Sequence, residues 1–301
     1  MLSAEERSQL VQVARLYYED NLTQAEIAKK IGVSRPTVSK MLTKAKEEGI
    51  VYIEIRAISE GNADLLKRLK QKFNLQGGLV VDNADHYWQE AAKYLHTELC
   101  YERNIGLGWG YAIGEIVKEL LVTGSKQQEG SLCPLIGEAH IPNKGYHPDE
   151  MVRQWSEASG RNAYLLNSPA FPASAEEREE YESGKSYQEV YQYWEQMNAA
   201  VVGIKGYPGV PDEATATRFG DALKQQKAVG SFLSYYYNER GSLISGNNDY
   251  CIHIPLALML RCSKVIGIVA DNNYKAASGA LKTGLLTHIV VTENIAHQLL
   301  K

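Results

Sequence analysis

The sequence lacks the features that mark membrane-spanning, secreted or zinc-binding proteins. Its 301 residues contain no uninterrupted apolar run of about 18 residues, which is the length that a membrane-spanning helix needs. The opening stretch, MLSAEERSQL, has no charged-then-apolar layout of a secretion signal. There are only four cysteines, none in C-x2-C spacing and none with a histidine at a ligand-like offset. We therefore expect a soluble cytoplasmic protein with free thiols, no metal site, no cofactor and no membrane partner.

An excess of charge of one sign is also missing. The formal net charge is −4, with 23% charged and 44% hydrophobic residues, which is ordinary for a globular protein. Such a balance excludes a chain whose whole surface binds nucleic acid, but it allows a local basic element. The length fits two domains.

One local basic element is present, and the residues around it predict three helices. Residues 32–46, GVSRPTVSKMLTKAK, contain four cations and no acid. Apolar residues at helical spacing predict a first helix over 4–19. Thr23 and Glu26 form the pattern of a capping box, so a second helix is expected from about residue 24.

The join between the second and third predicted helices is short. Gly32 can adopt the positive φ that ends a helix. Ser34 is a suitable N-cap, and Pro36 then falls in the first turn, where a missing N–H costs nothing. Helix, three-residue turn and helix together predict a helix-turn-helix motif. The expected inward positions are Ile27, Ala28, Ile31, Val33, Val38, Met41 and Leu42.

The outward residues of the third helix are cations and short hydrogen-bonding groups. In a helix-turn-helix the second helix of the motif enters the major groove, where such groups contact base edges and phosphates. A merely solvated basic face is the alternative, but the caps, the turn and the apolar spacing all favour DNA binding. The predicted DNA contacts are Thr23, Gln24, Ser34, Arg35, Pro36, Thr37, Ser39, Lys40, Thr43 and Lys44.

A short strand or wing is expected after the third helix. Gly49 is a suitable end for that helix, and apolar residues alternate within 47–56. We therefore assign 1–56 to a winged helix-turn-helix domain and 57–301 to a second domain. A helix over 62–75 would link them, with an apolar stripe and basic residues that are solvated or contact DNA or a partner subunit.

The second domain alternates short apolar runs with helical patterns. Runs such as KVIGIVA and HIVVT are apolar throughout, which is typical of parallel strands covered on both faces. We predict an α/β fold with a doubly wound sheet. The expected strands are 78–82, 104–109, 132–137, 162–168, 199–206, 228–237, 263–271 and 287–293.

Ligands of such sheets bind beyond the carboxyl ends of the strands, so the residues that follow the strands are candidates. Glycines 108 and 110 precede a helix whose N-terminal N–H groups suit an anion such as phosphate. The stretch GLGWGYAIG does not match the dinucleotide-binding pattern. Plain turn glycines are the alternative. The predicted contacts are Gly108, Trp109, Gly110, Tyr111, Gly137, Glu138, Lys205, Asp271, Asn272, Asn273 and Lys275.

The chain resembles a known family over about residues 10–301. ARLYYEDNLTQAEIAKKIGVSRPTVSKMLTKAKEEGIV is similar to the N-terminal domain of SorC/DeoR-type bacterial transcriptional regulators, and IGLGWGYAIGEIVKEL and KVIGIVADNNYKAASGALKTG follow in the family's order. The resemblance implies a sugar- or phosphosugar-sensing domain related to sugar-phosphate isomerases and deaminases. It also implies a homodimer or homotetramer whose binding to double-stranded operator DNA changes with the effector. By position, Gly108 to Gly110 and Lys275 would contact a ligand phosphate.

Three positions depart from the family's pattern. Asp271–Asn272 or Asn272–Asn273 stands where the family usually has Gly-Gly, and Tyr111 and Ala112 stand where a small hydroxyl residue often occurs. Ser231 stands where an acid is usual, and it joins the predicted effector contacts. Two of these departures fill or depolarise the expected pocket. An atypical sugar phosphate, an unphosphorylated sugar or polyol, and a different kind of ligand all stay open as the effector.

An isomerase-like enzyme and a pure interaction scaffold are the alternatives to a regulator. An isomerase-like enzyme would need a general acid and base, for which Asp271, Glu138 and His140 are the candidates. No dense set of acids, histidine and lysine follows the strands, so we assign no catalytic residue. A pure interaction scaffold is disfavoured by the polar loops that follow several strands. The operator, the sign of regulation and the choice between dimer and tetramer are not encoded in any motif.

Overall fold

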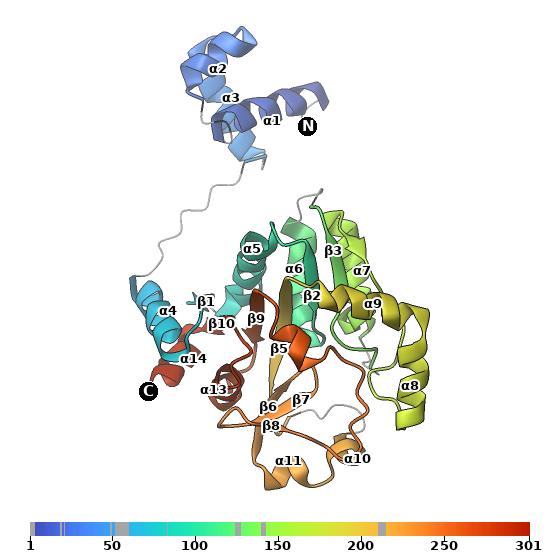
Figure 1. Ribbon diagram of the computed structural model, residues 1–301. Coiled ribbons are helices and arrows are strands. Elements are labelled where there is room, and N and C mark those ends of the chain that lie inside the picture. Colours follow the sequence, from blue (N-terminus) through green and yellow to red (C-terminus); the bar gives the residue numbers. More distant parts are fainter. Residues whose placement is uncertain are drawn as a thin grey trace. The chain divides into compact units, whose positions relative to one another are not determined.

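Figure 1 shows the computed structural model of the chain. Two compact units, Met1–Ile58 and Ser59–Lys301, make up the protein. No helix in the described part is long and apolar enough to cross a membrane. The structure describes residues 4–18, 20, 22–48, 50–51, 60–82, 84–123, 128–139, 143–209 and 215–301.

The first unit contains three helices around a small core. They are α1 (Ala4–Tyr18), α2 (Gln24–Ile31) and α3 (Arg35–Glu47). Val33 was expected inside but is 38% exposed, because it lies in the turn between α2 and α3 rather than on a helix face. The buried side chains that pack together are Val13, Leu16, Ile27, Ala28, Val38 and Leu42.

Local capping interactions start and end these helices as predicted. The Thr23 side chain accepts the Glu26 N–H while the Glu26 carboxylate accepts the Thr23 N–H at 2.8 Å. Gly32 ends α2 with φ 73°, and Ser34 caps α3 by accepting the Thr37 N–H at 3.3 Å. These caps satisfy N–H groups that have no partner within the helix. The helix-turn-helix prediction is therefore confirmed.

The predicted wing is only partly within the described structure. The cap of α3 is Glu48, and Gly49 lies outside the described residues. Ile50 and Val51 are described and belong to no strand, while 52–56 lies outside the described residues. The wing therefore stays a prediction.

A seven-stranded parallel sheet forms the centre of the second unit (Figure 1). Its order is β1-β10-β9-β5-β2-β3-β4. Every residue of β3 and most residues of β5, β9 and β10 are buried, as predicted for strands covered on both faces. The bounds are β1 (Gly77–Val81), β2 (Asn104–Leu107), β3 (Ser131–Pro134), β4 (Asn162–Ala163), β5 (Ala199–Gly206), β9 (Lys264–Val269) and β10 (His288–Thr292).

The connections wind in two directions from the middle of the sheet. From β2 the chain moves through α6 and α7 to β3 and β4, whereas from β5 it moves the opposite way to β9 and, through α13, to β10. Right-handed crossovers in opposite directions place helices on opposite faces, which confirms the doubly wound fold. The helices are α4 (Glu60–Phe73), α5 (Tyr87–Leu99), α6 (Tyr111–Thr123), α7 (Pro148–Ser159), α8 (Ala175–Ser183), α9 (Lys185–Glu195), α13 (Tyr274–Lys282) and α14 (Glu293–Leu300).

Two strand predictions were wrong. The run 228–237 is a hairpin of β6 (Ala228–Phe232) and β7 (Tyr235–Asn238), which turns at Leu233 and Ser234 with φ 47° and 62°. Two-residue hairpin turns usually contain Asn or Gly, and this one does not, so the apolar run looked continuous. The unit also contains three short α-helices and one more strand: α10 (Thr215–Phe219), α11 (Ala222–Gln225), β8 (Leu243–Ile244) and α12 (Leu256–Met259).

The predicted strand 162–168 is also much shorter than expected. Only two of its residues pair with β3. The buried Asp149 carboxylate accepts the N–H groups of Leu166 and Asn167 at 3.0 Å, so these groups are drawn away from the sheet.

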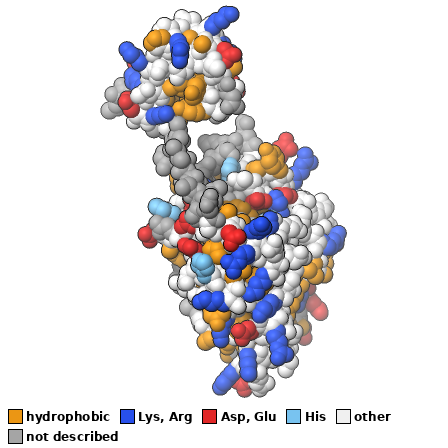
Figure 2. All heavy atoms as spheres, turned by 90° about the vertical axis from the view of Figure 1, so that its left-hand side faces the viewer, with side chains coloured by type: hydrophobic (Ala, Val, Ile, Leu, Met, Phe, Trp, Pro, Cys, Tyr) orange, Lys and Arg blue, Asp and Glu red, His pale blue; other side chains and the backbone are white. Residues whose placement is uncertain are grey.

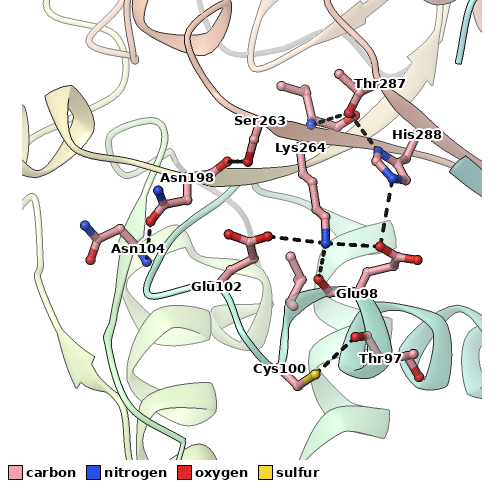
Figure 3. A network of polar contacts seen from close by, with 12 residues as sticks. Thr97, Glu98, Cys100, Glu102, Asn104, Asn198, Ser263, Lys264, Thr287 and His288 are labelled. Carbon is pink, nitrogen blue, oxygen red and sulfur yellow. Dashed lines mark hydrogen bonds and ion pairs between the residues drawn. The ribbon is translucent and has the colours of Figure 1, made fainter. Parts of the chain in front are cut away.

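Ion pairs hold the amino ends of the strands against α5. Figure 3 shows Lys264 at the start of β9, with its Nζ 3.2 Å from carboxylate oxygens of Glu98 and Glu102. Burial acts to lower the pKa of Lys264, but its hydrogen bonds to both acids outweigh this and raise it. His288 at the start of β10 lies beside Glu98 (Nε2–Oε2 3.9 Å), and burial lowers its pKa. The candidate effector residues lie at the opposite, carboxyl ends of the strands.

Candidate functional site

The residues predicted to contact DNA lie at the surface of the first unit. Every predicted residue of α3 is exposed, Thr23 is exposed and Gln24 is half-buried. The Thr23 and Ser34 hydroxyls are engaged in capping, and Ser34 Oγ lies 2.7 Å from Thr37 Oγ1. Figure 2 shows Lys and Arg side chains spread over this unit. The surface therefore offers exposed cations around hydroxyls that the helix caps orient.

A groove of about 580 Å³ lies where the three helices meet. Its lining includes Thr23 and Gln24 at the start of α2, and Arg35 at the start of α3. The first-turn N–H groups of α2 and the Arg35 guanidinium suit a phosphate of the DNA backbone. Tyr17 and Tyr18 also line the groove, a position that the helical pattern of the sequence alone does not indicate.

The candidate effector residues meet where the winding of the sheet reverses, between β2 and β5. The Gly108 N–H donates to Val201 O at 2.7 Å, which brings the loop after β2 against β5. Lys205, near the end of β5, holds its Nζ 5.1 Å from the centre of the Trp109 ring. Ser231 is buried and pairs with Lys205 across the antiparallel contact of β5 and β6. The fold thus brings together predicted residues that lie more than 90 positions apart in the sequence.

The two glycines of the loop after β2 have structural roles. A Cβ at Gly108 would lie 3.0 Å from Val201 O, so the close approach to β5 favours glycine. Gly110 has φ 89°, and its N–H donates to Tyr146 O at 3.4 Å. Both glycine N–H groups are therefore engaged by carbonyls. Any anion at this loop would depend on the first-turn N–H groups of α6.

The loop after β9 is fastened to the end of β5. Asp271 Oδ2 accepts the Gly206 N–H at 3.3 Å, and the Asn273 side chain caps α13 by accepting the Ala276 N–H at 3.1 Å. A Cβ at Gly206 would lie only 2.5 Å from Asn273 Nδ2. These contacts give two predicted effector residues a positioning role. Asn272 and Lys275 are exposed beside them.

Gly137 and Glu138 form a neighbouring group after β3. Glu138 Oε2 lies 2.8 Å from His147 Nδ1, and Glu138 Oε1 accepts the Asp149 N–H at 3.1 Å. Burial raises the pKa of Glu138. The Gly110–Tyr146 hydrogen bond connects this group to the loop after β2.

Two candidates of the enzyme alternative, Glu138 and Asp271, contact different groups in the described part of the chain. Glu138 contacts His147, whereas Asp271 contacts the backbone of Gly206. His140 lies outside the described residues. No group of three or more His, Cys, Asp or Glu side chains in the described residues is arranged to hold a metal ion.

Several residues at this edge of the sheet were missed by sequence reasoning. The tip of the β6–β7 hairpin reaches His253, whose Nδ1 lies 2.8 Å from Leu233 O. The His253 ring stacks on Tyr235 with ring centres 3.8 Å apart, and burial lowers its pKa to about 4. The Phe171 ring lies 6.2 Å from the Trp109 ring. No local pattern signals these contacts, because each joins segments that are distant in the sequence.

Comparison with known proteins identifies the family. Residues 59–301 match the family described as "Putative sugar-binding domain", and residues 6–54 match the MarR family. The sorbitol operon regulator of Klebsiella pneumoniae is 28% identical over 309 residues, with 97% of each chain covered. The chain belongs to the SorC/DeoR-type transcriptional regulators. The resemblance stated from the sequence is confirmed.

Further relatives of this SorC/DeoR-type regulator are also named as regulators. The deoxyribonucleoside regulator of Bacillus subtilis strain 168 is 27% identical, with 96% of each chain covered. The crystal structure of the full-length sorbitol operon regulator SorC from Klebsiella pneumoniae has a TM-score of 0.78 at 26% identity and covers 98% of both chains. A probable sor operon regulator from Shigella flexneri shares the fold, with a TM-score of 0.70 at 22% identity over 80% of this chain and 99% of its own. These relatives are named as regulators, which supports the regulator and not the enzyme alternative.

Proposed function

We propose that this SorC/DeoR-type regulator controls a carbohydrate-utilisation operon in response to a sugar, a polyol or a sugar phosphate. Residues 1–56 would bind double-stranded operator DNA, and 57–301 would bind the effector and form a homodimer or homotetramer. The observation that carries the proposal is the meeting of Trp109, Lys205 and the start of α6 at the reversal point of the sheet, within a match to a sugar-binding family. Ligands of doubly wound sheets bind at this point.

Coupling between the two sites follows from linkage. An effector that binds one arrangement of the oligomer more tightly shifts the population toward it, and operator affinity changes by the ratio of the two affinities. A coupling of about 1–3 kcal/mol gives a change of about 5–150-fold. The proposed contacts are those assigned from the sequence, with Asp271 and Asn273 acting mainly by holding the loop that leads into α13, whose first turn carries Lys275.

The DNA-binding role is tested with Arg35→Ala and Lys40→Ala in a gel-shift titration. Both side chains are exposed on α3, so each variant should weaken operator binding without unfolding the protein. Loss of a phosphate contact should lower the slope of log K against log salt by about 1. Lys224→Ala, an exposed cation of the second unit, is the matched control. Unchanged operator affinity in both α3 variants would contradict the recognition-helix assignment.

The effector role is tested by thermal shift with matched sugars and polyols, each with and without phosphate. A ligand at 100 times its Kd should add about 2.7 kcal/mol of stability. Stabilisation only by phosphorylated ligands, abolished by Lys275→Ala but not by Lys224→Ala, would support an anion site at α6 and Lys275. Stabilisation only by unphosphorylated ligands would assign the site to hydroxyl groups. Stabilisation by none of them would contradict the proposal.

A further inference from the structure

A pocket of about 410 Å³ lies between the loop that follows β4 and the corner at which α8 meets α9. Among the described residues that line it, none is a predicted DNA or effector contact. Hydrogen bonds within the protein hold its walls. The Asp149 carboxylate accepts the N–H groups of Leu166 and Asn167, and Glu177 Oε2 accepts the Ala173 N–H at 2.6 Å. These contacts give the pocket a fixed shape that is separate from the candidate effector site.

Ser168, in the lining of this pocket, has a buried hydroxyl without a partner. The residue is 4% exposed, and its Oγ forms no hydrogen bond within the described chain. Its backbone carbonyl, by contrast, accepts the Glu138 N–H at 2.8 Å. A buried hydroxyl that lacks a hydrogen bond is unfavourable, and a hydroxyl can both donate and accept. The lining therefore offers a bound molecule one buried polar group that the protein itself does not use.

The first turn of α9 is a second polar part of the lining. This helix has 11 residues, and its N-cap, Gly184, provides no side-chain cap. The N–H groups of Lys185, Ser186 and Tyr187 have no partner within the helix, and all three residues line the pocket. Such N–H groups, together with the positive end of the helix dipole, attract a carboxylate or another anion. The α9 side of the pocket thus suits a negative group.

The α8 side of the pocket carries negative charge. Glu177 and Glu180 lie three positions apart, which places them on one face of α8, and both line the pocket. A dianion such as phosphate would be repelled by these two carboxylates, whereas an ammonium group would be attracted to them. Tyr181 adds apolar surface to the same wall. A molecule with a carboxylate, an ammonium group and a side chain matches all of these features.

We propose that this pocket binds a free α-amino acid. The carboxylate of the ligand accepts from the first turn of α9, its ammonium group lies against Glu177 and Glu180, and the Ser168 hydroxyl hydrogen-bonds the same polar head. The site is additional to the proposed effector site, and one backbone pairing connects the two. Ser168 O accepts the Glu138 N–H, and the Ala170 N–H donates to Glu138 O at 2.6 Å. Occupancy of the pocket is thereby linked to the residues that follow β3.

Isothermal titration calorimetry of the full-length protein with each of the standard amino acids tests the proposal. The amino acid that binds most tightly is then compared with two analogues, one without the amino group and one without the carboxylate. For leucine these are 4-methylpentanoate and 3-methylbutylamine. Each analogue should bind at least about tenfold more weakly, because each loses one charged contact. Absence of binding by every amino acid would overturn the proposal. Equal affinity of the analogue without the amino group would do so too, since the pocket would then hold a carboxylate anion alone.

Two variants locate the binding in this pocket. Glu180→Gln removes one charge from the ammonium end, so it should weaken amino-acid binding about tenfold and reduce the preference over the analogue without the amino group. Ser168→Ala should also weaken binding about tenfold, yet it should not lower the thermal stability of the ligand-free protein, because no internal hydrogen bond is lost. Glu179→Gln, an exposed acid of α8 outside the lining, is the matched control and should keep the wild-type affinity. Wild-type affinity in both folded variants would overturn the site.

Discussion

The contacts that stabilise the first unit and those that stabilise the second differ in how far apart the contacting residues lie in the sequence. In the first unit the helix caps join residues three positions apart, as in Thr23–Glu26 and Ser34–Thr37. In the second unit the site depends on pairs such as Trp109–Lys205, which only the sheet brings together. Local contacts form independently of the rest of the chain, whereas the candidate effector residues meet only when the whole sheet is folded. Perturbing one unit should therefore leave the other largely intact.

Cations are also used differently in the two units. On α3 they are exposed, which suits binding that depends on salt and tolerates movement along a phosphate backbone. In the second unit the Lys205 Nζ lies 5.1 Å from the centre of the Trp109 ring, and Arg218 is buried and paired with Asp249.

The largest expected effect comes from the core of the second unit. Trp194 is 1% exposed, and its Nε1 donates to Pro134 O at 2.9 Å. Trp194→Ala should lower the free energy of unfolding by about 3–5 kcal/mol. Urea unfolding followed by tryptophan fluorescence reports on the second unit alone, because all four tryptophans lie beyond residue 58. Tyr101→Ala, at a side chain that is 94% exposed, should have almost no effect.

Hydrogen exchange of the same Trp194→Ala variant sharpens the comparison. Peptides covering α2 and α3 should keep their wild-type protection, because the contacts that cap them are local. Loss of protection in these helices at the same urea concentration as the fluorescence transition would show that the two units unfold together.

A smaller, pH-dependent effect is expected from His253. Burial lowers its pKa to about 4, so between that value and the ordinary 6.5 the unfolded chain binds the proton more strongly. The free energy of unfolding should thus fall by up to about 3 kcal/mol as the pH is lowered from 6.5 toward 4. His253→Gln should flatten this dependence in urea titrations at several pH values. The exposed His297→Gln should not, and equal slopes in both variants would assign the dependence to other groups.

The smallest effect is expected at the cap of α3. Ser34→Ala removes the acceptor of the Thr37 N–H and should destabilise the first unit by about 1 kcal/mol. Ser39→Ala, at an exposed position within the helix, is the control and should not lower its stability. Hydrogen exchange of α3 measures the difference. A matching decrease in the fluorescence-detected stability of the second unit would contradict the separation of the two.

The sequence predicted those structural features that depend on residues a few positions apart. The capping box at Thr23, the positive φ of Gly32 and most strand positions follow from spacing alone. The hairpin at Leu233–Ser234 was missed because its turn carries no Asn or Gly signal. Arg218 and Asp249 were missed because neither belongs to a motif, and their pairing spans 31 positions.

By itself, the sequence determined the helix-turn-helix, the alternation of strands and helices, and the loops in which effector contacts were sought. Those features depend on periodicity and on caps within a few residues, so a linear pattern encodes them. Only the tertiary structure decided that the Gly108 and Gly110 N–H groups are already engaged, that Asp271 positions a loop, and that Arg218 is buried against Asp249. The physical reason is that the strand order β9-β5-β2 sets which loops meet, and that order results from packing across the whole sheet.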